Sequence, residues 1–161
     1  MKDNITLEKI KLLHPKLVKE ASDIYNDISI QLKDKSVCRF TSTLRTFEEQ
    51  DEIYAQGRTK AGSIVSHSKG GLSYHNYGLA IDIVLLIDGK ATWDTKTDFD
   101  KDGISDWMEV VAIFKSYGWE WGGNWKFKDA PHFQKTFGYS VRQLLELYRN
   151  KKYYTNKYVI I

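Results

Sequence analysis

Apolar residues first recur at helical spacing in the N-terminal third of this chain. Seven apolar positions after Pro15 fall on one face of a helix; they are Leu17, Val18, Ala21, Ile24, Tyr25, Ile28 and Leu32. Proline fits the first turn of a helix, because its missing N–H would have no partner there. We therefore expect a helix that begins near Pro15 and packs this face on the core.

Runs of consecutive apolar or β-branched residues predict short strands. The longest run is strongly apolar and is interrupted only by Asp82. Asp88 and Gly89 follow this run and predict a tight hairpin turn. The strands that we expect are residues 37–42, 80–87, 90–93 and 132–134. Because hairpins join neighbouring strands, the sheet should be small and mainly antiparallel.

Capping signals predict three further helices. Thr46 with Glu49 forms a capping box before a helix that ends near Gly57, and Ser140 with Gln143 caps the last helix. Between them, residues 106–117 are expected to form a helix that Gly118 stops. No regular alternation of strand and helix occurs, so the fold class should be α+β, with helices flanking the sheet.

One segment without periodicity separates the second helix from the long strand. Residues 58–78 are rich in glycine, serine and lysine, which predicts a long surface loop, and such loops often carry function. We find no linker and no internal repeat in the sequence. We therefore expect residues 1–161 to form a single compact domain without a separate wall-binding domain, in which residues 151–161 pack as a terminal strand.

Composition and charge exclude several classes of protein. The chain is 42% apolar and 28% charged, as in ordinary globular proteins. Its net charge of +3 is too mild for a nucleic-acid footprint but suits an anionic polymer. Cys38 is the sole cysteine, lies in a predicted strand and should be a buried, non-catalytic thiol. Without a signal-peptide pattern or a long apolar run, we expect a monomer made in the cytoplasm and not stably bound to membranes.

His75 and Asp82 form the first part of a candidate metal site. Burying a carboxylate alone between Ile81 and Ile83 would cost several kcal/mol, so Asp82 needs a cation, either a metal ion or a salt-bridge partner. His75 lies seven residues earlier, with Gly78 between them to turn the chain. A catalytic zinc site needs three such protein ligands and keeps the fourth position for water.

A second motif supplies the remaining groups. Asp129 and His132 flank Pro131, which fixes the geometry between the acid and the imidazole. Taken alone, each histidine could instead be an ordinary surface or core residue that binds no metal. His67 lies in the predicted surface loop, and we expect it to face solvent.

These motifs resemble the LAS zinc peptidases, and within them the L-alanyl-D-glutamate peptidases of phage endolysins and bacterial autolysins. The resemblance covers nearly the whole chain and is carried by His14-Pro15, Leu44 to Thr46, Glu49-Gln50, Tyr54 to Thr59, His75 to Asp82, Trp119 to Trp125 and Asp129 to Phe133. It implies the LAS fold, which is shared with hedgehog-like proteins, zinc as the cofactor and bacterial peptidoglycan as the partner.

The resemblance also implies roles for single residues. It makes His75, Asp82 and His132 the zinc ligands, Asp129 the catalytic acid and base, and Arg45 the cation that binds the substrate or its oxyanion. Four further residues would contact substrate, although loop hydrogen bonding and core packing are their alternatives; they are Ser73, Gln50, Trp121 and Trp125.

The implied function is hydrolysis of the L-alanyl-D-glutamate bond of peptidoglycan by a phage endolysin that reaches the cell wall at host lysis. One alternative is a D-alanyl-D-alanine carboxypeptidase or dipeptidase. Asp129 and Pro131 argue against it, because those relatives usually have glutamate as the base and tryptophan before the last histidine. The other is a non-catalytic, zinc-stabilised wall-binding module, which would not need Asp129 as a base.

A second metal hypothesis concerns residues 98–109. Acids occupy positions one, three, five, nine and twelve, and glycine occupies position six, as in an EF-hand calcium loop. The candidate calcium ligands are Asp98, Asp100, Asp102, Ile104, Asp106 and Glu109. Against this reading, Ser105 replaces the usual apolar residue and no entering helix is predicted. The alternative is an acidic turn that favours the N-terminus of the next helix.

Overall fold

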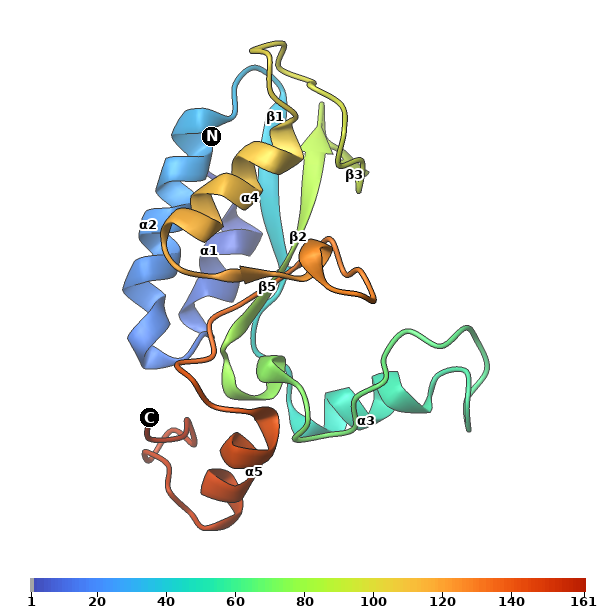
Figure 1. Cartoon of the computed structure of the whole chain (residues 1–161), viewed down its shortest axis with the longest axis vertical. Coiled ribbons are helices and arrows are strands. Elements are labelled where there is room, and N and C mark those ends of the chain that lie inside the picture. Colours follow the sequence, from blue (N-terminus) through green and yellow to red (C-terminus); the bar gives the residue numbers. More distant parts are fainter. Residues whose placement is uncertain (1) are drawn as a thin grey trace.

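A five-stranded antiparallel sheet lies at the centre of the computed structural model, which describes residues 2–161 (Figure 1). Its strands are β1 (Ser36–Ser42), β2 (Ala80–Ile87), β3 (Lys90–Thr92), β4 (Glu120–Trp121) and β5 (His132–Gln134). The α-helices are α1 (Asn4–Lys11), α2 (Pro15–Gln31), α3 (Phe47–Ala55), α4 (Asp106–Ser116) and α5 (Val141–Arg149). Two 3-10 turns complete the fold, η1 (Tyr74–Tyr77) and η2 (Gly122–Asn124). The predicted α+β class is confirmed.

Strand β2 is the centre of the sheet. The strand order is β1-β2-β5-β4, and β3 pairs with the far end of β2 through the predicted hairpin. The register between β2 and β5 places Asp82 directly opposite His132. Directly paired residues of antiparallel strands lie on the same face of the sheet, so these two side chains are brought together by the backbone alone.

The core lies between the sheet and helices α1, α2 and α4, which cover one face (Figure 1). The predicted apolar face of α2 is confirmed, because its buried residues are Leu17, Ala21, Ile24, Tyr25 and Ile28. Across the core, Phe114 of α4 stacks on Phe133 of β5 with 4.1 Å between ring centroids. Cys38 is buried as predicted, and burial raises the pKa of its thiol. A thiol held protonated in this way is structural.

The predicted N-cap residues of α3 and α5 are confirmed, and the full capping box is formed at α5. The Thr46 side chain accepts a hydrogen bond from the Glu49 N–H at 3.0 Å, and α3 then ends at Ala55. Ser140 and Gln143 form a complete capping box at the start of α5. Of the helices within residues 2–161, none combines the length and the hydropathy that a membrane crossing requires.

Two predicted segments differ in the structure. The end of the expected loop 58–78 is the 3-10 turn η1, where Ser73 and Asn76 form a capping box and His75 is buried. Residues 151–161 are not a strand, since their pairing is a single bridge between Tyr153 and Val159. This segment is fixed instead by distant partners, because the buried Val159 carbonyl accepts a hydrogen bond from His14 Nε2 at 2.8 Å.

Helix α1 is an element that the sequence reading did not predict. Asp3 is its N-cap and accepts hydrogen bonds from the N–H and the hydroxyl of Thr6. Thr6 and Ile10 are its buried residues. With eight residues and few apolar positions, α1 shows little periodicity and depends on tertiary packing.

Candidate metal centre

Three elements bring His75, Asp82 and His132 together. His75 comes from η1, Asp82 from β2 and His132 from β5. One ligand atom of each residue lies within 4.8 Å of the other two, and the rings of the two histidines are 5.1 Å apart. Both imidazoles are buried, whereas the Asp82 side chain keeps a quarter of its surface exposed. Asp82 is therefore the most exposed of the three side chains.

The tautomer of His75 is fixed by its far nitrogen. Nδ1 lies 2.8 Å from the main-chain carbonyl of Thr43, which can only accept, so His75 donates from Nδ1. Nε2 then carries a lone pair, is buried and has no hydrogen-bond partner. It lies 3.2 Å from Asp82 Oδ2 without bonding to it. Two lone pairs that face each other at this distance call for a cation between them.

The tautomer of His132 is fixed in the same way by Gln134, a residue that sequence reasoning missed. Gln134 donates from Nε2 to Glu120 Oε2 at 3.1 Å, which leaves its Oε1 to accept from His132 Nε2 at 2.8 Å. His132 Nδ1 therefore faces Asp82 Oδ1 at 3.0 Å. A signal for Gln134 existed in the sequence, since alternate residues of a strand share a face.

The charges of the site favour a positive ion. Burial works to raise the pKa of Asp82, but the neighbouring imidazoles of His132 and His75 outweigh it and hold this pKa well below its usual range. Burial works to lower the pKa of His132, but the Asp82 carboxylate outweighs it and raises this pKa. Two nitrogen donors and one carboxylate around a buried lone pair fit a divalent transition metal such as zinc.

Arg45 lies beside the three candidate ligands, at the predicted corner between β1 and α3. Its Nη2 is 3.8 Å from Asp82 Oδ2, and its Nη1 donates to Gln50 Oε1 at 2.9 Å. Gln50 is fully buried and donates to Ser66 and Ser68, so both ends of its amide are used inside the protein. Gln50 therefore orients the Arg45 guanidinium through Nη1, while Nη2 faces Asp82.

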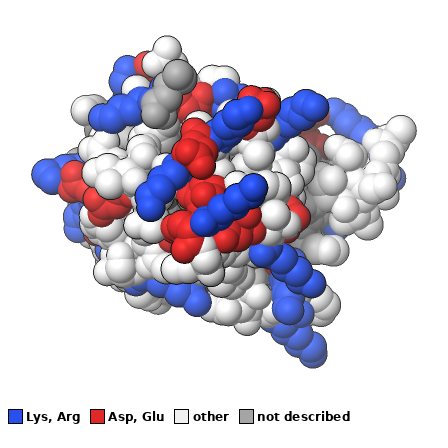
Figure 2. Space-filling view, turned by 90° about the horizontal axis from the view of Figure 1, so that it is seen from above, with Lys and Arg blue, Asp and Glu red and all other residues white. Residues whose placement is uncertain are grey.

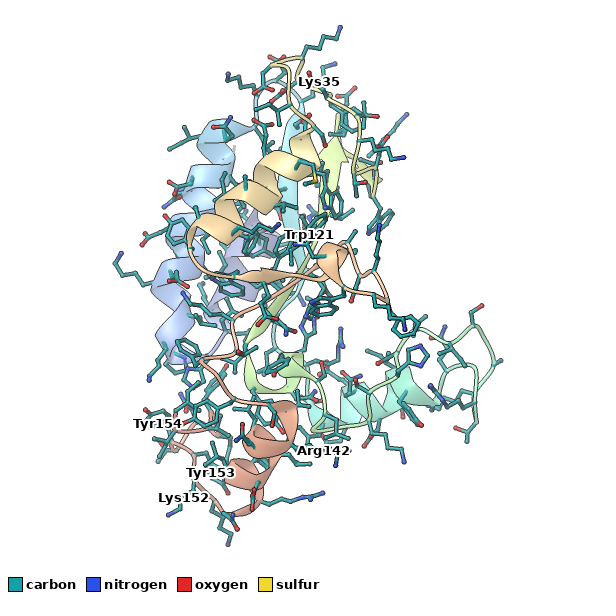
Figure 3. All side chains as sticks on the ribbon, in the orientation of Figure 1. Lys35, Trp121, Arg142, Lys152, Tyr153 and Tyr154 are labelled. Atoms are coloured by element: carbon teal, nitrogen blue, oxygen red, sulfur yellow. The ribbon has the colours of Figure 1, made fainter. Side chains whose placement is uncertain are left out.

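The candidate ligands line one wall of a cavity of about 720 Å³. The cavity is also lined by Arg45, Ser73, Trp125, Asp129 and the exposed His67. Trp121 lies elsewhere, next to α4 at the centre of Figure 3, where its Nε1 donates to the Ala130 carbonyl at 2.7 Å. The structure thus brings Ser73 and Trp125 to the cavity, whereas Trp121 contacts the main chain next to Asp129.

Asp129 is positioned by main-chain hydrogen bonds. Its N–H donates to the Gly122 carbonyl at 2.9 Å, and its carbonyl accepts from the His132 N–H at 3.1 Å. A side chain at Gly122 would meet the Asp129 carbonyl at 2.4 Å, so this close approach requires glycine. The residue is exposed at the cavity rim, yet partial desolvation raises the pKa of its carboxyl above the ordinary value.

The acidic residues of 98–109 do not line this cavity; they lie after β3 and in the first turn of α4. Two groups place carboxylate oxygens within 4.8 Å of one another, Asp98 with Asp100 and Asp106, and Asp100 with Asp102 and Glu109. Burial raises the pKa of Glu109 to about 7. As predicted, a strand and not a helix precedes the loop, while α4 follows it.

Comparisons with known proteins identify similar sequences. Residues 66–135 match the model of a family described as D-alanyl-D-alanine carboxypeptidase. The peptidoglycan L-alanyl-D-glutamate endopeptidase CwlK of Bacillus subtilis (strain 168) is 57% identical over 96 residues, which are 58% of this chain and 58% of the relative. The L-alanyl-D-glutamate peptidase of Listeria phage A118 is 35% identical over 96 residues, 55% of this chain and 32% of that protein.

A solved structure is similar as well. The L-Ala D-Glu endopeptidase ChiX of Serratia marcescens superposes with a TM-score of 0.55 at 25% identity, covering 83% of this chain and 88% of that one. The resemblance inferred from the motifs is therefore confirmed in sequence and in fold. The match spans 58% and 32% of the lengths of the two curated relatives.

Proposed function

We propose that this chain, which is similar in sequence and fold to L-alanyl-D-glutamate peptidases, is a zinc-dependent peptidase of bacterial peptidoglycan. Its substrate would be the L-alanyl-D-glutamate bond of the stem peptides. The observation that carries the proposal is the convergence of His75, Asp82 and His132 in a cavity that also holds Arg45 and Asp129. Four of these five residues fall within the segment that matches the family model.

The metal-binding atoms follow from the hydrogen bonds of the site. His75 would bind zinc through Nε2 and His132 through Nδ1, since the other nitrogen of each ring donates to a protein oxygen. Asp82 would supply the third ligand from between them. When bound, zinc acidifies water and polarises a carbonyl group.

The protein's own residues would move the protons. Asp129 accepts a proton from the attacking water and returns it to the amine of D-glutamate as the carbon–nitrogen bond breaks. Arg45, held by Gln50, places its positive charge where the carbonyl oxygen becomes negative. Ser73 and Trp125 line the same cavity and are the candidate substrate contacts. Trp121 and Gln50 do not line it, and they would support the site through their hydrogen bonds to Ala130 and Arg45.

Two alternative functions predict different products or none. The matching family is described by D-alanyl-D-alanine carboxypeptidase activity, which releases the terminal D-alanine. The names of the relatives and the residues Asp129 and Pro131 favour cleavage after L-alanine instead. A non-catalytic wall-binding module would have no use for the carboxyl of Asp129 at the cavity rim.

The test compares wild-type and Asp129→Asn protein, each loaded with zinc, on purified peptidoglycan. Mass spectrometry should find new N-terminal D-glutamate with wild type only, while both proteins hold equal zinc. Release of D-alanine would support the carboxypeptidase. If wild-type protein binds peptidoglycan and cuts nothing, the wall-binding module replaces the peptidase.

We further propose that residues 1–161 act as one catalytic domain, because the helices and the sheet share a single core, and that this domain is a monomer. The site of action would be the cell wall, and the role that of an endolysin, by similarity to the phage relative. Light scattering during gel filtration should give a mass near 18.7 kDa. A mass of twice that value would contradict the monomer.

A further inference from the structure

The loop of residues 98–109 carries a second cluster of ligating groups that the peptidase site does not use. It follows β3 and includes the first turn of α4, at the top of Figure 1. Figure 2 views this end of the molecule and shows acidic side chains gathered near the middle, with lysine and arginine side chains beside them. Gly103 at position six has a φ of +103°, a conformation that the sharp turn of a calcium loop also requires.

Three carboxylates in the loop have one oxygen that is buried and unpartnered. These oxygens are Asp100 Oδ1, Asp106 Oδ2 and Glu109 Oε2. All three residues are more than nine-tenths buried, with 7%, 0% and 4% of their surfaces exposed. In each case the other oxygen accepts a hydrogen bond from the protein; the donors are Lys33 N, Phe99 N and Gln31 Nε2, at 2.9, 2.7 and 2.6 Å.

This arrangement is unfavourable unless a cation joins it. A buried carboxylate oxygen without a partner loses its hydration and gains nothing in exchange. Asp100 belongs to both groups of close oxygens, so the negative charges also repel one another. The hydrogen bonds to the outer oxygens hold the inner oxygens in place. The three unpartnered oxygens are therefore held in positions where a bound cation would stabilise them.

We propose that residues 98–109 bind a calcium ion. All of the donors are oxygens, and none is a histidine or cysteine, which selects a hard cation over zinc. The ligands would be the carboxylates of Asp98, Asp100, Asp102, Asp106 and Glu109 and the main-chain carbonyl of Ile104. Glu109 has one oxygen engaged with Gln31, so it offers calcium a single oxygen.

Calcium at this position would connect three elements. Gln31 ends α2, Lys33 leads into β1, and Asp106 begins α4. Each of these is hydrogen-bonded within the loop or to it. Calcium should therefore stabilise the folded chain, and amide replacements of the ligands should relieve repulsion in its absence. This opposite behaviour with and without calcium distinguishes a binding site from an acidic turn.

The experiment measures thermal unfolding of protein that has been stripped of metal on a chelating resin and then reloaded with zinc. It is done before and after addition of 1–5 mM calcium chloride, on the order of concentrations that weak extracellular sites require. Calcium should raise the Tm of wild type by several degrees. Glu109→Gln and Asp100→Asn should start at or above the wild-type Tm and lose the calcium shift. Asp88→Asn, which changes an exposed carboxylate in the hairpin, should keep the shift.

Direct binding gives a second readout that does not depend on peptidase activity. Terbium luminescence excited through Trp107, within the loop, should appear with wild type and Asp88→Asn and be lost with Glu109→Gln. Calcium should displace it. The proposal is overturned if calcium neither shifts the Tm of wild type nor displaces terbium, or if the loop variants respond as wild type does. An equal Tm shift with magnesium would overturn the assignment to calcium.

Discussion

At the scale of single residues, the far nitrogen of each imidazole determines what its near nitrogen can bind. Thr43 fixes His75 through a main-chain carbonyl, which no side-chain substitution removes. Gln134 fixes His132 through a side-chain amide that Glu120 orients. The two histidines thus differ in how mutation can disturb them.

Replacing Gln134 by leucine should weaken zinc binding. The His132 ring would lose the acceptor that keeps its proton on Nε2, and loss of such a partner typically lowers metal affinity by roughly 10–100-fold. Competition with a chromophoric zinc chelator would measure the change. Gln143→Leu, which alters only the cap of α5, serves as the control and should bind zinc like wild type. Wild-type affinity in Gln134→Leu would mean that His132 needs no such support.

The sequence predicted the candidate ligands but not their support. Asp82 stands out as an acid in an apolar strand with His75 seven residues before it, and the resemblance to the LAS zinc peptidases adds His132 to this set. The role of Gln134 could not be predicted from the sequence, because it depends on which end of the Gln134 amide faces His132. That orientation is set by Glu120, which is distant in sequence and adjacent only once β4 pairs with β5.

At the scale of elements, prediction succeeded where the signal is local. Helix α2, the hairpin of β2 with β3 and the cap of α5 are all specified by residues within each element. The turn η1 and the C-terminal segment are not, because their partners are far away along the chain. Asn76 of η1 donates to the Arg45 carbonyl, and Tyr158 donates to the Leu12 carbonyl.

Helix α1 shows how one acid joins an element to the sheet. Asp3 caps α1 and also receives two hydrogen bonds from Arg39 of β1, at 2.8 and 3.0 Å. The hydrogen bond from Arg39 is the main cause that lowers the pKa of Asp3 from 3.8. A group whose pKa is lower in the folded protein stabilises it above the unfolded value and loses this effect as pH falls through the folded pKa.

Replacing Asp3 by asparagine should therefore destabilise the protein in a pH-dependent way. Asparagine still caps the helix, so the loss reflects the Arg39 pair and should be about 1 kcal/mol at pH 7. Urea unfolding of both proteins should show this difference at pH 7 and a smaller one at pH 3. A difference that is equal at both pH values would show that shape, and not charge, makes Asp3 important.

At the scale of the whole molecule, the two proposed metal sites lie in different parts of the fold and share no residue. The candidate zinc ligands join η1, β2 and β5, while the acidic loop joins the end of α2 to the start of α4. Each ion would bind only the folded chain. Each would therefore raise the free energy of unfolding by about 2.7 kcal/mol at a free concentration 100 times its Kd.

Because the sites are separate, their stabilising effects should add. Chemical unfolding of metal-free protein, of protein with zinc, with calcium and with both ions would form a complete cycle, and the sum should hold within about 0.5 kcal/mol. His75→Ala should abolish the zinc effect and keep the calcium effect, and Glu109→Gln should do the reverse. An interaction above about 1 kcal/mol would instead mean that α4, which runs from the acidic loop toward β4, transmits order from one site to the other. In that case calcium would alter zinc affinity by the same factor that zinc alters calcium affinity, since such coupling is reciprocal.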